Sequence, residues 1–205
     1  MSREATAWHE GGHLAAAHCL GGRLGGASIR PGHWHLGQAE VHLGLDAEQL
    51  EAGWWAAVLG EPVKPELRDQ VERIAMMHLA GWVTEIRAGE RDLFTVEPPP
   101  DPHSPAERTR FLAAVNSGEP RPPSDLEATD ALLRRITATE EEAVAYRELL
   151  IERTFTLASM NPLFWPLAEA FARELLIHDE LSGAQVAAIV AEVNGEFPDA
   201  VPIPA

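Results

Sequence analysis

The segment ATAWHEGGHLAAAHCLGG, at residues 5–22, most constrains what this chain can fold into. Its small and apolar residues recur every three or four positions, at Trp8, Gly12, Ala16, Ala17 and Leu20. That spacing places side chains on one face of a helix. A glycine pair follows at residues 21–22, and glycine commonly ends a helix. The pattern predicts a helix over residues 3–20.

The rest of the sequence favours a mainly α fold. Apolar residues repeat at helical spacing in six later segments, at residues 46–60, 65–89, 124–136, 140–160, 163–178 and 183–193. Between residues 24 and 44, two short alternating segments are separated by Pro31-Gly32 and Gly37. They predict a small β-hairpin or ribbon after the first helix, with GASIRP (residues 26–31) as an exposed edge strand. Such an edge could pair with an extended peptide by β-augmentation.

A proline-rich stretch at residues 95–123 contains TVEPPPDPHSP and NSGEPRPP on either side of a modest helical segment. Proline clusters favour an extended surface excursion over a core element. We therefore expect residues 95–123 to be an insertion within a single domain spanning residues 1–205. The insertion is either a lid over a functional site or a loop without a role in function. Ser124 follows it as a predicted helix N-cap, with Glu127 three positions later, the spacing of a capping box.

The composition restricts the partners of the protein. Its 205 residues include 32 acidic and 16 basic side chains, for a formal net charge of −16 at pH 7. That charge argues against nucleic-acid binding and against docking on anionic membranes. The single cysteine, Cys19, excludes an internal disulfide and suits a reducing compartment. The N-terminal residues lack a secretory-signal pattern and no run of eighteen apolar residues occurs, so we expect a soluble, cytoplasmic protein.

Three residues of the first predicted helix carry the chemical signal, in the pattern H-E-x-x-H. His9 and His13 are four positions apart, so a helix projects both imidazoles from one face, one turn apart. Two such imidazoles can share one zinc ion at about 2.0–2.1 Å. Glu10 would lie beside a metal-activated water and could transfer its proton to a leaving amine. The pattern predicts a zinc hydrolase, against the alternative of a helix that merely carries these residues.

A catalytic zinc site needs a third protein ligand. Spacing alone does not select one among the available side chains: His18, His33, His35, His42, His78, His103, Glu85, Asp125, Glu127 and Asp130. His18 is five positions after His13 and is expected to face away from the site, in a structural or exposed role. His33 and His35 flank Trp34 in a turn, where two histidines more often have no catalytic role.

Four stretches of the sequence resemble, in order, the peptidase domain of FtsH-type ATP-dependent zinc proteases. The first runs from ATAWHEGGHLAAAHCL to RPGHWHLGQAEV and is similar to that family's H-E-A-G-H, its strand and its Leu-Gly. The second and third are MMHLAGWVTEIRAG and SDLEATDALLRRI, and the last is LAEAFARELLIHDELSGAQVAAIV. Each match is weak alone, but four matches in the family's order are specific and cover most of the chain.

The resemblance implies particular roles for five residues. His9 and His13 match the zinc-binding histidines, Glu10 matches the catalytic glutamate and Asp125 matches the third zinc ligand. An aspartate at a helix start is otherwise an ordinary cap or dipole partner, and only the resemblance favours a ligand. Glu85 matches a glutamate that we expect to support the site from outside the ligand set. The implied cofactor is Zn²⁺.

The chain also departs from the family pattern. No G-x-x-x-x-G-K-[ST] phosphate loop occurs in it, so ATP-driven unfolding is not expected of this polypeptide. Trp82 replaces the arginine of the family's A-G-R segment. We therefore expect a stand-alone zinc metallopeptidase acting on flexible or unfolded polypeptides. A variant of this prediction is a regulatory protease that cleaves one specific partner protein. The alternative is an inactive binding or scaffold protein with the same fold. A homo-oligomer and a separate ATPase partner both stay open.

Overall fold

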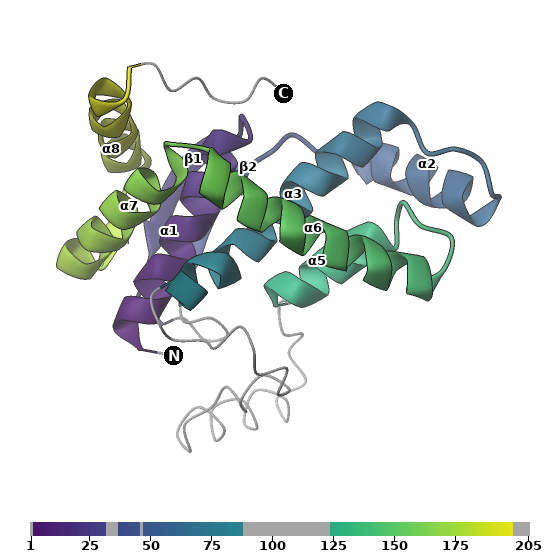
Figure 1. Ribbon diagram of the computed structural model, residues 1–205, viewed down its shortest axis with the longest axis horizontal. Helices are drawn as coiled ribbons and strands as arrows, with labels where there is room; N and C mark the ends of the chain where they lie inside the picture. Colours follow the sequence, from purple (N-terminus) through teal and green to yellow (C-terminus); the bar gives the residue numbers. More distant parts are fainter. Residues whose placement is uncertain (1, 32–36, 46, 88–123, 199–205) are drawn as a thin grey trace.

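The computed structural model describes residues 2–31, 37–45, 47–87 and 124–198. In chain order these ranges form α1 (Arg3–Cys19), β1 (Arg23–Ser28), β2 (Gln38–His42), α2 (Ala47–Val58), α3 (Pro65–Arg87), α5 (Asp125–Leu133), α6 (Glu140–Met160), α7 (Phe164–His178), β3 (Glu180–Leu181) and α8 (Gly183–Glu196) (Figure 1). The predicted mainly α fold, with a β-hairpin after the first helix, is confirmed. The proline-rich insertion predicted at residues 95–123 lies outside the described residues.

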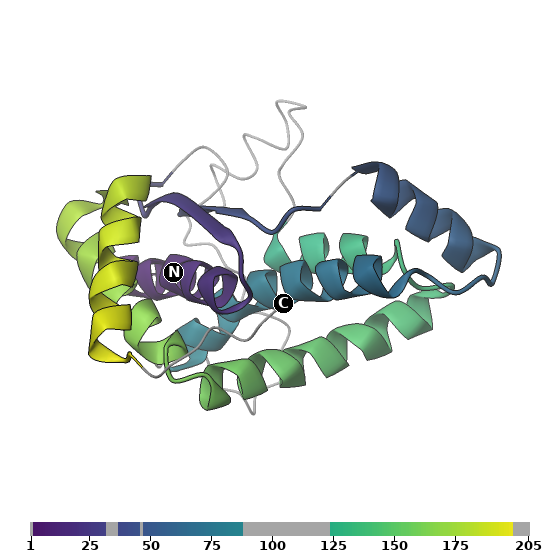
Figure 2. The same ribbon diagram turned by 90° about the horizontal axis from the view of Figure 1, so that it is seen from above.

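The helices are arranged around α1, which packs against both α3 and α7 (Figure 1). α1 lies close to α3 at Gly12, where a Cβ atom would be 2.4 Å from Oγ1 of Thr84 and 2.7 Å from the carbonyl oxygen of Ala80. Any larger residue there would push the two helices apart. On the α7 side, Phe164 and Phe171 are fully buried in the core. Figure 2 shows α2 and α8 at opposite ends of the molecule, with α1, α3 and α5 between them.

The sheet is antiparallel, with the strand order β2-β1-β3. β1 pairs with β2 from Arg23 opposite His42 to Ser28 opposite Gln38. On its other side, Ala27 and Ser28 pair with the two residues of β3. The prediction that residues 26–31 form an exposed edge strand is therefore wrong, because β1 is the central strand. The error arises because β3 is only two residues long and leaves no alternating pattern in the sequence.

Helix α5 begins with the predicted capping box. The Ser124 hydroxyl accepts a hydrogen bond from the Glu127 N–H at 3.3 Å, and the Glu127 carboxylate accepts one from the Ser124 N–H at 2.8 Å. This cap fixes Asp125 in the first turn of the helix. The predicted helical segments at residues 124–136 and 140–160 are separate helices, since α5 ends at Leu133 and Thr139 caps the start of α6. In the described residues, no helix has the length and apolar character needed to cross a bilayer.

Candidate metal centre

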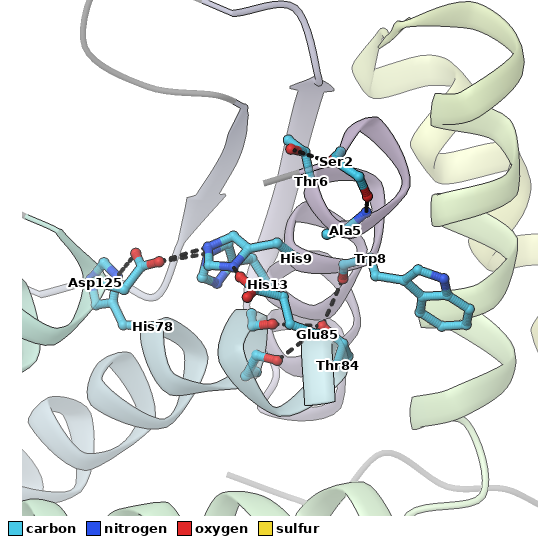
Figure 3. A network of polar contacts seen from close by, with 12 residues as sticks. Ser2, Ala5, Thr6, Trp8, His9, His13, His78, Thr84, Glu85 and Asp125 are labelled. Atoms are coloured by element: carbon cyan, nitrogen blue, oxygen red, sulfur yellow. Dashed lines mark hydrogen bonds and ion pairs between the residues drawn. The ribbon is translucent and has the colours of Figure 1, made fainter. Parts of the chain in front are cut away.

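α1 and α5 bring two histidines and an aspartate together (Figure 3). His9 and His13 lie one turn apart on α1, with ring centroids 4.6 Å apart and ring planes nearly perpendicular at 88°. Oδ2 of Asp125, from the first turn of α5, lies 2.7 Å from Nε2 of His9 and 3.3 Å from Nε2 of His13. One carboxylate oxygen therefore faces both imidazoles, although its residue comes from much later in the chain.

These three side chains form a group that could hold a metal ion. One ligand atom from each of His9, His13 and Asp125 lies within 4.8 Å of the other two. Ligands of a tetrahedral zinc ion are about 3.3 Å apart when each bond is about 2.0–2.1 Å. The separation of Asp125 Oδ2 from Nε2 of His13 matches that value, and its separation from Nε2 of His9 needs to grow by about 0.6 Å. Two nitrogens and one carboxylate oxygen are a donor set that zinc accepts.

The other nitrogen of each imidazole contacts α3. Nδ1 of His13 donates to the carbonyl oxygen of Met77 at 2.8 Å, and Nδ1 of His9 contacts Oε1 of Glu85. Glu85 is almost fully buried, with 1% of its surface exposed. Contacts of this kind fix the tautomer and leave Nε2 as the metal-binding atom. Glu85 therefore lies beside His9 and outside the group of three residues that could hold a metal ion.

Gly81 makes room for both imidazoles on α3. A Cβ atom at this position would lie 2.8 Å from Cε1 of His13, and equally close to Cε1 and Nε2 of His9. Real Cβ atoms do not make contacts this short, so any side chain at residue 81 would displace the imidazoles. The neighbouring Trp82, in place of the family's arginine, packs edge-to-face on Phe155 with ring centroids 5.9 Å apart.

The cluster changes the protonation of its members. Burial alone would lower the pKa of His9, but hydrogen bonds with Asp125 and Glu85 outweigh it and raise this pKa to about 10. Burial would likewise lower the pKa of His13, but the charge of Asp125, the hydrogen bond with Asp125 and the charge of Glu10 together raise it. Burial would raise the pKa of Asp125, but His13, His78 and His9 hold it well below its usual range. Asp125 is therefore an anion, as a metal ligand must be.

Glu10 lies next to the two histidines but outside the group of three ligand atoms. Its side chain is buried, with 5% of the residue exposed, and its charge contributes to the raised pKa values of both imidazoles. Gly37, directly before β2, lies against it, since a Cβ on Gly37 would be 2.6 Å from Oε1 of Glu10. A buried carboxylate at this position can exchange a proton with a group at the metal position.

Most of the other candidate ligands are placed elsewhere. His42 and Glu40 face each other at 3.6 Å on an exposed part of β2, Asp130 binds Arg147 at 2.8 Å, and Glu127 caps α5. His18 is partly buried, and burial lowers its pKa. His33, His35 and His103 lie outside the described residues.

His78 is the candidate whose position the sequence did not reveal. Its Nδ1 lies 3.2 Å from Oδ1 of Asp125, the carboxylate oxygen that does not face the two imidazoles. The sequence did contain one indication of this position. His78 and Glu85 are seven positions apart and therefore lie on the same face of α3. The Met77 contact involves only a backbone carbonyl, which no side-chain pattern can report.

Comparisons of the chain with protein-family models, curated proteins and solved structures find no match. The resemblance to the FtsH-type peptidase domain therefore rests on the four sequence segments quoted above. The chemistry of the site rests on the geometry of His9, His13, Asp125 and Glu10.

Proposed function

We propose that this protein is a zinc-dependent metallopeptidase that hydrolyses peptide bonds in flexible or unfolded polypeptides. The observation that supports it best is the meeting of His9, His13 and Asp125, with their ligand atoms within 4.8 Å, beside the buried carboxylate of Glu10. Two imidazoles and a carboxylate with an adjacent glutamate are the groups that metal-assisted hydrolysis of an amide needs.

The proposed mechanism assigns a task to each of these residues. His9, His13 and Asp125 would hold a zinc ion, which when bound would lower the pKa of a water molecule and polarise the scissile carbonyl. Glu10 would accept a proton from the attacking water as its oxygen bonds to the carbonyl carbon. Glu10 would then deliver that proton to the amine nitrogen as the C–N bond breaks. Glu85 and the Met77 carbonyl would keep the imidazoles oriented.

The sheet suggests how an extended substrate would be bound. Within the described part of the chain, β2 has a partner on one side only, so its other edge can accept hydrogen bonds from a peptide. Gly37 precedes β2 and touches Glu10. A substrate strand on this edge would therefore run past the Glu10 carboxylate, and we assign to β2 the substrate pairing that the sequence had suggested for residues 26–31.

Substrates would be flexible or unfolded because only an extended peptide can pair with the edge of a strand. A separate ATPase partner and a homo-oligomer are compatible with this proposal, and a cytoplasmic location stays a prediction.

Hydrolysis of fluorescein-labelled casein by the zinc-loaded protein tests the proposal. Glu10→Gln should bind zinc as the parent does and lose at least about 10²-fold in turnover, because it cannot accept the proton. Glu4→Gln, at an exposed position of the same helix, is the matched control and should keep the parent's activity. Equal turnover by the parent and Glu10→Gln would exclude the peptidase and leave the alternative of an inactive binding or scaffold protein.

A further inference from the structure

We propose that His78 is a positioning residue for Asp125, which holds one carboxylate oxygen so that the other faces the metal position. This inference rests on the proposed function, because it concerns the third ligand of the same site. It assigns a role to a residue that neither the H-E-x-x-H pattern nor the matched segments single out.

The two oxygens of Asp125 have different partners. Oδ2 faces Nε2 of both His9 and His13, at 2.7 and 3.3 Å, whereas Oδ1 faces Nδ1 of His78 at 3.2 Å. A carboxylate can only accept hydrogen bonds, so Nδ1 of His78 must be the donor. A neutral imidazole in this tautomer is sufficient, and the role therefore does not depend on the charge of His78.

Asp125 needs such a partner more than the two histidines do. The side chain of Asp125 is 34% exposed, whereas that of His13 is 8% exposed and that of His9 is 17% exposed. The capping box fixes the backbone of Asp125 but leaves its carboxylate free to rotate. Without a donor on Oδ1, only the contacts of Oδ2 with His9 and His13 would hold this partly exposed carboxylate.

With His78 included, α3 supports every member of the ligand group. Glu85 contacts His9, the Met77 carbonyl accepts from His13 and His78 donates to Asp125 (Figure 3). One rigid helix thus sets the orientation of ligands from two others, α1 and α5. Loss of an outer partner of this kind typically lowers metal affinity by about 10- to 100-fold.

The geometry assigns His78 a supporting role and not that of a fourth ligand. The group whose ligand atoms lie within 4.8 Å of one another contains His9, His13 and Asp125 but not His78. The ring of His78 is also 6.4 Å from that of His13, measured between centroids, and its Nδ1 contacts the outer oxygen of Asp125. The remaining coordination position thus stays available to water and substrate.

Cobalt titration tests the inference with a readout independent of turnover. The visible d–d absorption of bound Co²⁺ reports coordination geometry, and competition with a chelator gives its affinity. His78→Leu removes the donor and should weaken Co²⁺ binding about 10- to 100-fold and change the absorption spectrum. His78→Asn keeps an N–H donor at the place of Nδ1 and should restore most of the affinity and the parent spectrum. His178→Gln, at an exposed histidine at the end of α7, controls for the loss of a surface histidine and should match the parent.

The outcomes separate this inference from the proposed function. Parent-like affinity and spectrum in His78→Leu would overturn the role of His78 alone, and so would equal losses in His78→Leu and His78→Asn. A parent protein that binds no Co²⁺, or one that binds it equally after His13→Ala, would overturn the metal site and the inference together. If circular dichroism shows that His78→Leu does not fold, His78→Ala provides the second variant without a donor.

Discussion

Nε2 of His9 lies 2.7 Å from Oδ2 of Asp125, although 116 positions separate the two residues in the sequence. The pair joins the N-terminal helix α1 to the first turn of α5. Two residues of α3 contact its outer atoms, Glu85 at His9 and His78 at Asp125. Because Asp125 is an anion and the pKa of His9 is raised to about 10, a proton bridges this pair near neutral pH in the absence of an ion. A metal ion must displace that proton to bind.

Metal binding should therefore release protons. At pH 7 the imidazole of His9 is protonated in the metal-free protein, since its pKa is about 10. Calorimetric titration with Zn²⁺ in buffers of different ionisation enthalpy should detect roughly one proton or more released per bound ion. Release close to zero at pH 7 would show that His9 is not displaced from Asp125, and would contradict this account.

The same pair predicts how the stability of the metal-free protein depends on pH. The folded pKa of His9 lies above its ordinary value of 6.5, so its contribution is complete below pH 6.5 and is lost as the pH rises towards 10. The folded pKa of Asp125 lies below its ordinary value of 3.8, so its contribution is present above that pH and is lost on acidification. The pair should therefore stabilise the fold most between about pH 4 and 6.5.

Urea unfolding of the metal-free parent and of Asp125→Asn, from pH 5 to pH 10, measures this contribution. The difference in the free energy of unfolding should be largest near pH 5–6 and should shrink as the pH approaches 10, because His9 then loses its proton. A difference that stays constant over this range would exclude the proton-bridged pair.

Gly81→Ala should damage the site. The added Cβ would lie 2.8 Å from ring atoms of both His9 and His13, so the imidazoles or α3 must move. We expect a loss of about 1–3 kcal/mol in the free energy of unfolding and weaker Zn²⁺ binding. Denaturant unfolding and a chelator competition assay measure the two effects.

Gly195→Ala is the matched control for this substitution. A Cβ at Gly195, in α8, would have no neighbour within 4 Å, so the change should be neutral or slightly stabilising, with unchanged metal affinity. Equal behaviour of the two variants would contradict the close packing of Gly81 against the histidines.

Much of the fold followed from sequence periodicity. The helices predicted outside the proline-rich stretch are all present in the described residues, and the Ser124 capping box was evident from the spacing of Ser124 and Glu127. The central position of β1 could not be predicted, because its second partner is the two-residue β3. Ser28 of β1 and Glu180 of β3 are 152 positions apart in the sequence. So short a pairing is decided by tertiary packing, which places β3 and α8 against β1.

The site was only partly predictable. The spacing of His9 and His13 on a helix gave two candidate ligands, because helical geometry fixes which side chains share a face. Asp125 came from the family resemblance, since an aspartate at a helix start is otherwise an ordinary cap. The roles of His78 and the Met77 carbonyl depend on how α3 is rotated against α1 and α5, which sequence spacing within one helix does not determine.

A crystal structure of the zinc-loaded protein, with anomalous diffraction measured at the zinc absorption edge, tests the central claim most directly. The account predicts a single strong anomalous peak within bonding distance, about 2.0–2.2 Å, of Nε2 of His9, Nε2 of His13 and an oxygen of Asp125, with Glu10 beside it. An absence of zinc between these three side chains, or zinc bound only to other residues, would contradict it.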